Sequence, residues 1–188
     1  GIIYDVMRDE MYHGGGQFDV KCNDKVLKPF RNRPLKRFLI ASNAGMLERN
    51  DWGVADLTKD CLGARAYGSA AISFSRILQG RLLTYITYLY PWDYAAASIL
   101  GERLGYQVMT LDGGKPDYKT RQGIMMLPKE KISELQEYIY RRGENYMRFH
   151  TGFEEKYQQL LGKEAASFFS TFDQKTISAF RTNHLQEG

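Results

Sequence analysis

Between residues 37 and 142, short apolar runs of strand length alternate with segments whose apolar residues recur at helical spacing. This alternation predicts an α/β fold with α+β layering, in which helices cover the faces of sheets. The strand-like runs are residues 37–41, 82–90, 106–111 and 123–127, and the helical patterns are residues 68–80, 93–105 and 129–142. We also expect a helix to begin near Asn43 and an irregular segment to follow it as far as Leu62.

The first thirty residues show a pattern typical of antiparallel hairpins. The β-rich runs at residues 2–7, 10–13 and 18–27 are interrupted by three consecutive glycines and by Asn23-Asp24. Glycine accepts positive φ without penalty, and Asn and Asp favour turns. A small sheet of consecutive strands is therefore expected ahead of the alternating region.

Length and composition limit the classes of protein to consider. A chain of 188 residues can bury one sizeable core, or one core and a small extra unit. No apolar run approaches the roughly 20 residues of a membrane span, so we expect no membrane partner. Cys22 and Cys61 form no CxxC motif and no secretory leader is visible, which predicts reduced cysteines and a cytoplasmic location.

Positive charge is concentrated in residues 25–37, KVLKPFRNRPLKR. The formal net charge of the chain is only +4, yet this stretch holds six lysines and arginines. Its two prolines and its lack of an apolar stripe predict a loop or a sheet edge. Two interpretations remain open, a solvated basic loop or a rim that attracts anions.

Asp93 follows Pro91-Trp92 and precedes a run of small apolar residues. An aspartate at a helix N-cap accepts hydrogen bonds from the free N–H groups of the first turn. A carboxylate held at the junction of a strand and a helix is also well placed to bind a cation. The sequence alone is compatible with both roles.

Three blocks, taken in order, carry a resemblance to a known family. They are GIIYDVMRDEMYHGGG, ARAYGSAAISFSRILQGRL and PWDYAAASILGERLGYQVMTLDG. Their motifs and separations resemble the C-terminal half of the inositol monophosphatase family, from residue 1 to about residue 140. The resemblance implies that family's sandwich of alternating helices and sheets, and a Mg²⁺-dependent phosphomonoesterase activity.

The resemblance also implies roles for particular residues. Asp93 falls on the Trp-Asp carboxylate that coordinates a catalytic Mg²⁺ in the family. Gly68, Ser69 and Ala70 fall on the segment that lies beside the substrate. Inositol-binding members often carry a glutamate seven residues before the Trp-Asp acid, where this chain has Ile86, and the second glycine of the family's "E-x-G-G" is replaced by a tyrosine. The substrate is therefore open among an inositol phosphate, a related sugar or polyol phosphate, and a nucleotide.

The remaining metal ligands of the family lie in an upstream "G-x-x-E" segment and a "D-P-I/L-D-G-T" loop, and we expect neither in this chain. Phosphate hydrolysis with two metal ions needs several carboxylates to hold the ions about 3.5–4 Å apart. We therefore assign no catalytic residue and expect a fragment that is inactive alone. Its partners would be the missing N-terminal half of the same domain and a small phosphorylated polyol or sugar, with a homodimer as a further option.

Residues 147–188 form a second region beyond the phosphatase-like residues 1–142. They resemble the N-terminus of the Nol/Nop/Sun family of rRNA cytosine methyltransferases, in "F-x-x-K-Y … L-L-G-x-E" and in "a-F-R-x-N". The region is either a helical extension or the start of a separate methyltransferase chain. An alternative function, a non-enzymatic RNA-binding module, would use this tail and the basic residues 25–37, although RNA is not the partner that the phosphatase resemblance implies.

Overall fold

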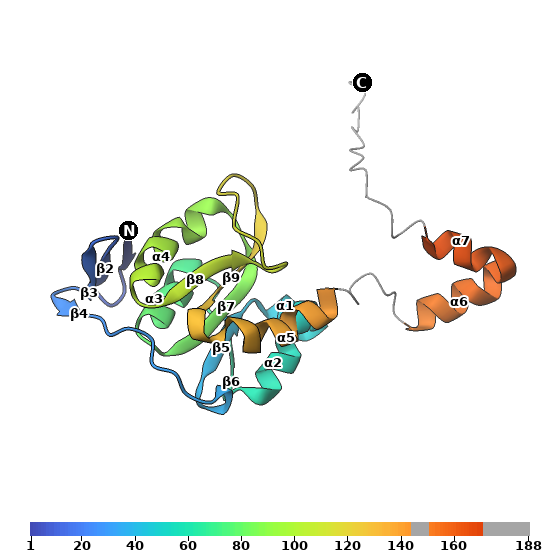
Figure 1. The fold of residues 1–188 in the computed structure, drawn as a ribbon, viewed down its shortest axis with the longest axis horizontal. Helices are drawn as coiled ribbons and strands as arrows, with labels where there is room; N and C mark the ends of the chain where they lie inside the picture. Colours follow the sequence, from blue (N-terminus) through green and yellow to red (C-terminus); the bar gives the residue numbers. More distant parts are fainter. Residues whose placement is uncertain (144–150, 171–188) are drawn as a thin grey trace, which may run out of the picture. The chain divides into compact units, whose positions relative to one another are not determined.

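The computed structural model describes residues 1–143 and 151–170, and the chain divides into two compact units, Gly1–Gly143 and Glu144–Gly188. Each unit is described by itself. Within the described residues, the first unit holds two sheets, five α-helices and three short 3₁₀ helices, and the second holds short helices (Figure 1).

The first sheet is a meander of consecutive strands, as the hairpin pattern predicts. Its order is β1-β2-β3-β4 and every neighbouring pair is antiparallel. Its strands are β1 (Ile2–Asp5), β2 (Glu10–Gly15), β3 (Phe18–Cys22) and β4 (Lys25–Val26). One face of this sheet is buried through Ile3, Tyr12 and Val20, which lie in the core beneath it.

The second sheet is mixed and has the order β6-β5-β7-β9-β8. Strands β6, β5 and β7 are parallel neighbours, whereas β9 is antiparallel to both β7 and β8. Its strands are β5 (Leu39–Ser42), β6 (Gly63–Arg65), β7 (Leu82–Leu89), β8 (Tyr106–Thr110) and β9 (Gln122–Pro128). The predicted fold class is confirmed, because helices connect the parallel strands and the sheets form separate layers.

Two helices, α3 (Ala70–Leu78) and α4 (Pro91–Arg103), contact strands of both sheets and form the layer between them (Figure 1). The far face of the second sheet is covered by α1 (Ala44–Arg49), α2 (Val54–Asp60) and α5 (Ile132–Gly143). Two apolar clusters fill the spaces on either side of the second sheet. None of the helices in the described residues combines the length and hydropathy needed to cross a bilayer.

The ends of α3 are set by local sequence. Ser69 is the N-cap, and its side-chain oxygen accepts the N–H of Ile72 at 3.4 Å. At the other end Gly80 has φ +72°, a conformation that glycine adopts without strain. The Gly80 N–H donates to Ile77 O at 2.8 Å and the Arg81 N–H to Arg76 O at 2.9 Å, the two bonds of a Schellman motif.

The helix expected to begin near Asn43 is α1, but the expectation of an irregular segment from there to Leu62 is wrong, because α2 lies within it and β6 follows directly. Asn50 has φ +54° and ends α1, while its side-chain oxygen accepts the N–H groups of Ala55 and Asp56 at 2.8 and 3.2 Å. One asparagine thus ends one helix and begins the next. A helix of seven residues shows too little periodicity for its sequence pattern to reveal it.

The second unit contains α6 (Thr151–Leu161), a 3₁₀ turn (Gly162–Glu164) and α7 (Ala165–Ser170). The rings of Tyr157 and Phe168 stack with centroids 5.3 Å apart, so these short helices pack on each other. The tail's Phe180-Arg181-Thr182-Asn183 motif lies outside the described residues. The methyltransferase resemblance and the assignment of this unit as a separate domain stay predictions.

A buried cation joins the first sheet to α3. The Arg76 side chain is 5% exposed, and it donates to Asp5 at 3.1 Å and to Glu10 at 3.3 Å. Asp5 is itself only 2% exposed and also pairs with the exposed Arg8 at 3.2 Å. Because a buried charge that loses its partner is costly, these bonds fix how β1 and β2 lie against the helix.

Replacing Asp5 by alanine should therefore lower the free energy of unfolding by about 3–5 kcal/mol, since it leaves the Arg76 guanidinium buried without its main partner. Arg8→Ala is the matched control and should cost less than about 1 kcal/mol, because it removes only the exposed half of the network. Urea denaturation followed by circular dichroism measures both. Equal losses in the two variants would contradict the role given to the buried pair.

Candidate functional site

The carboxyl ends of three neighbouring parallel strands meet at one edge of the second sheet. Each strand is followed by the N-terminus of a helix, with Asn43 capping α1 after β5, Ser69 capping α3 after β6, and Tyr90 capping α4 after β7. In sheets of this kind, ligands bind outside the carboxyl ends of the strands. The predicted site residues all fall at this edge.

The predicted substrate segment is the start of α3. Gly68 has φ +68°, and a Cβ atom placed there would meet no atom within 4 Å, so the residue is needed for its backbone conformation rather than for space. The first intrahelical donor is the Ser73 N–H, which bonds Ser69 O at 3.0 Å. Among the described residues no acceptor is found for the N–H groups of Ala70 and Ala71. Free N–H groups at a helix N-terminus favour anionic or hydroxyl ligands.

Asp93 does not occupy the N-cap position that the sequence suggested. The helix begins two residues earlier, at Pro91, whose missing N–H costs nothing at that position. The carboxylate reaches back so that its Oδ2 accepts the N–H of Tyr90 at 2.9 Å, while the Asp93 N–H donates to the Tyr90 carbonyl at 3.0 Å. Asp93 therefore still caps the helix, but as the third residue of the first turn.

One carboxylate oxygen of Asp93 is left for other chemistry. Only Oδ2 takes part in the bond to Tyr90, and no donor to Oδ1 is found within the described ranges. The side chain is half-buried, so this oxygen can meet a ligand while the other holds the helix end. The capping role and a metal-binding role are thus compatible in one residue.

Tyr85 of β7 is a site neighbour that sequence reasoning missed. Its ring meets Phe74 of α3 edge-on, with centroids 5.3 Å apart. Burial raises the pKa of the Tyr85 hydroxyl, hydrogen bonding to Ser73 and Thr87 acts in the opposite direction, and the nearby charge of Asp93 adds to the increase. The Tyr85 ring therefore packs on α3, and its hydroxyl is near enough to Asp93 to be affected by the charge of that carboxylate.

The adjoining strand ends are held by polar side chains. Asn43 donates to Thr87 Oγ1 at 2.8 Å and accepts the Met46 N–H at 2.8 Å, and Ser42 donates to the Ile86 carbonyl at 2.7 Å. The Ile86 side chain itself is 1% exposed and packs in the apolar cluster under α1, α2 and α5. The position at which some family members carry a glutamate is thus part of the core here.

Asp93 is a potential metal ligand that is not part of a larger cluster of ligand side chains among the described residues. No group of three or more His, Cys, Asp or Glu side chains that could hold an ion occurs in the described residues. Mg²⁺ prefers octahedral coordination by oxygen, so the donors described here fit one position of such a site and do not complete it. The letters G-x-x-E do occur at residues 45–48, contrary to expectation, but Glu48 is an exposed residue of α1.

Comparison with known proteins places the first unit in a family. The Inositol monophosphatase family profile matches residues 1–144, which confirms the sequence resemblance. The Inositol-1-monophosphatase of Bacillus subtilis (strain 168) is 37% identical over 118 residues, which are 60% of this chain and 44% of that protein.

Two solved structures match the fold. One is inositol monophosphate-bound SaIMPase-II, with a TM-score of 0.72 and 26% identity over 79% of this chain and 59% of that chain. The other is an IMPase/NADP phosphatase complexed with Mg²⁺ and phosphate, with a TM-score of 0.65 and 22% identity over 73% of this chain and 52% of that chain. The chain thus spans about half the length of the relatives it matches.

The capping role of Asp93 can be tested by stability alone. Asp93→Ala removes the acceptor of the Tyr90 N–H and should lower the free energy of unfolding by about 1 kcal/mol. Asp93→Asn keeps an acceptor oxygen and should cost about half as much. Glu102→Ala, in the last turn of α4, is the exposed control and should cost almost nothing. A loss in Asp93→Asn as large as in Asp93→Ala would rule out the cap.

Proposed function

Because this chain belongs to the inositol monophosphatase family, we propose that it supplies the C-terminal half of a Mg²⁺-dependent phosphomonoesterase that hydrolyses inositol phosphate or a related sugar or polyol phosphate. The supporting observation is that the open helix start at Ser69 and Ala70 and the half-free carboxylate of Asp93 lie at the same edge of the second sheet. The free N–H groups of the helix start suit a phosphate or hydroxyl, and the Asp93 carboxylate suits a cation.

The residues of this chain would bind and orient the substrate. The N–H groups of Ala70 and Ala71 and the hydroxyl of Ser69 would donate hydrogen bonds to oxygens of the polyol or its phosphate, and Gly68 would give the backbone turn. Asp93 would contribute one oxygen to Mg²⁺, with its orientation fixed by the Tyr90 N–H. When bound, the ion would polarise the phosphate and lower the pKa of a bound water.

The proposal includes a requirement for a second half. The described residues bring no three His, Cys, Asp or Glu side chains together in a group that could hold an ion, whereas metal-assisted phosphate hydrolysis uses several carboxylates. The first sheet has a suitable attachment surface, because β1 pairs only with β2 within the described residues and its other edge is open. Ile2 (66% exposed), Tyr4 and Met11 are apolar or aromatic side chains on the uncovered face of this sheet. A complementary half would cover both the edge and the face.

The test is a chimera in which the part of the Bacillus subtilis Inositol-1-monophosphatase that precedes the aligned region is joined to residue 1 of this chain. We expect phosphate release from inositol phosphate that depends on Mg²⁺, and none from residues 1–188 alone. Asp93→Asn in the chimera should lower the rate at least about 100-fold, because a lost metal ligand removes several kcal/mol of transition-state stabilisation.

Glu102→Gln is the matched control, an acid of the same helix in its last turn, and should leave the rate unchanged. The proposal fails if the Asp93→Asn chimera keeps full activity, or if residues 1–188 alone release phosphate as fast as the chimera. A chimera that folds cooperatively yet releases no phosphate from any polyol or sugar phosphate would also reject it.

A further inference from the structure

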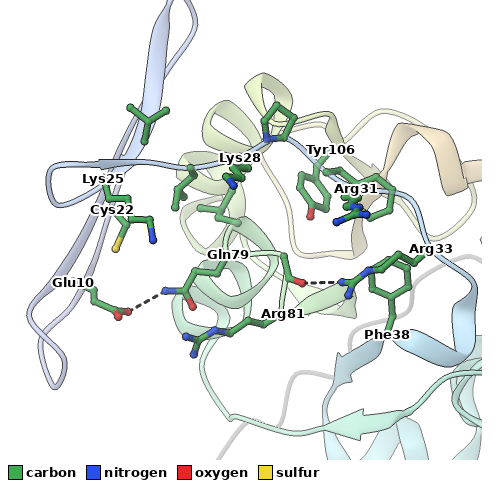
Figure 2. A pocket seen from close by; sticks show the side chains of 16 residues that line it. Glu10, Cys22, Lys25, Lys28, Arg31, Arg33, Phe38, Gln79, Arg81 and Tyr106 are labelled. Carbon is green, nitrogen blue, oxygen red and sulfur yellow. Dashed lines mark hydrogen bonds between the residues drawn. The ribbon is translucent and has the colours of Figure 1, made fainter.

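A cavity of about 650 Å³ lies away from the carboxyl edge, at the far end of α3. Figure 2 shows it between the first sheet, the connecting segment that follows β4, and the turn that ends α3. Nine residues of helix separate Ser69 from this turn, which corresponds to about 13 Å along the axis. The proposed phosphatase chemistry therefore makes no use of this cavity.

Cations from three places in the sequence line the cavity. They are Lys25 of β4, Lys28, Arg31 and Arg33 of the connecting segment, and Arg81 after α3 (Figure 2). None of these five forms an ion pair with another described residue. The basic residues 25–37 include β4 and a 3₁₀ turn (Leu35–Arg37), and four of their six cations line one cavity with exposed side chains.

Glu10 is the one acid among the residues that line the cavity, against five cations. Glu10 already accepts hydrogen bonds from Tyr12 at 2.6 Å, from Arg76 at 3.3 Å and from Gln79 at 3.4 Å, the last drawn in Figure 2. The hydrogen bond from Tyr12 is the main cause that holds the pKa of Glu10 below its usual value. All three bonds go to Glu10 Oε2, and the one from the buried Arg76 pairs this carboxylate with a cation outside the lining.

Arg33 is the cation of this set with a structural role. It donates to the Gly80 carbonyl at 3.5 Å and lies over the Phe38 ring at 4.6 Å, so it helps to cap the C-terminus of α3. The side chains of Lys25, Lys28, Arg31 and Arg81 have no hydrogen-bond acceptor in the described part of the chain. Four positive charges are thus left around one cavity.

The connecting segment is held in place. The Leu27 N–H donates to Val20 O and the Phe30 N–H to Leu104 O, both at 2.8 Å. The Phe30 ring packs against Phe38 and Tyr106, with centroids 5.7 and 5.6 Å apart. The cations are therefore carried on a backbone that is fixed before any ligand arrives, which lowers the entropic cost of binding.

We propose that this cavity is a binding site for a small anion that carries two or more phosphate groups. Its volume falls within the range of small-molecule sites. Phosphate oxygens are suitable acceptors for guanidinium and ammonium groups, and several phosphates are needed to match several unpaired cations. RNA is less well suited, because the cations converge on one cavity, while Lys36 and Arg37 of the same basic segment are not among its lining residues.

The test is calorimetric titration of the full 188-residue chain with tripolyphosphate at low salt. We expect saturable binding, weakened at least about tenfold by the double variant Arg31→Gln/Arg81→Gln, since hydrogen bonds to charged groups are strong. The control Lys36→Gln/Arg37→Gln removes the same charge from outside the cavity and should weaken binding less than about twofold. Thermal unfolding checks that both variants remain folded.

Absence of tripolyphosphate binding by the unmodified chain would overturn the proposal, as would equal weakening by the two double variants, which would indicate diffuse charge. A single-stranded RNA is titrated in parallel. If RNA binds more tightly than tripolyphosphate and both variants weaken it equally, the basic segment is a nucleic-acid surface and the small-ligand site is rejected. None of these readings depends on phosphatase activity, so they are separate from the test of the proposed function.

Discussion

The buried guanidinium of Arg76 is the constraint on which the first unit depends. It lies on α3, in the layer between two sheets, and bonds to Asp5 of β1 and Glu10 of β2. Its third partner is Gln79 of its own helix, at 2.9 Å. Apolar contacts between a helix and a sheet allow the helix to shift slightly along the sheet. A buried charge does not, because it needs its hydrogen-bonding and ion-pair partners at fixed positions. The network therefore sets the position of α3 relative to the first sheet.

The position of α3 determines where the two proposed ligand sites lie. The N-terminus of α3 brings Ser69 and Ala70 to the edge that also carries Asp93. The C-terminal turn places Arg81 beside the segment that carries Lys28 and Arg31. One helix of nine residues thus has a proposed substrate site at one end and a proposed polyphosphate site at the other.

The sequence predicted those helices and turns whose ends are set by residues that are neighbours in the chain. The helical pattern over residues 68–80 matches α3 and its Gly80 end, and the turns at residues 14–16 and 23–24 define the hairpins, whereas the Ser69 cap is seen only in the structure. The Arg76–Asp5 pair joins residues 71 positions apart, and neither the pair nor the placement of Tyr85 leaves a periodic signal. Asp93 was identified as a capping and candidate metal residue, but its exact place was missed because Pro91 starts the helix earlier. The roles of Asp93, Gly68, Ser69 and Ala70 toward a ligand stay proposals.

We propose that Asp93 caps α4 with one carboxylate oxygen and binds a metal ion with the other. Both roles can be observed in a crystal structure of the chimera grown with Mn²⁺ and phosphate, since Mn²⁺ scatters anomalously. We expect an ion about 2.1 Å from Asp93 Oδ1, phosphate or its water shell at the Ala70 N–H, and an intact bond between Oδ2 and the Tyr90 N–H. An occupied metal site with no oxygen of Asp93 in its coordination sphere would contradict it.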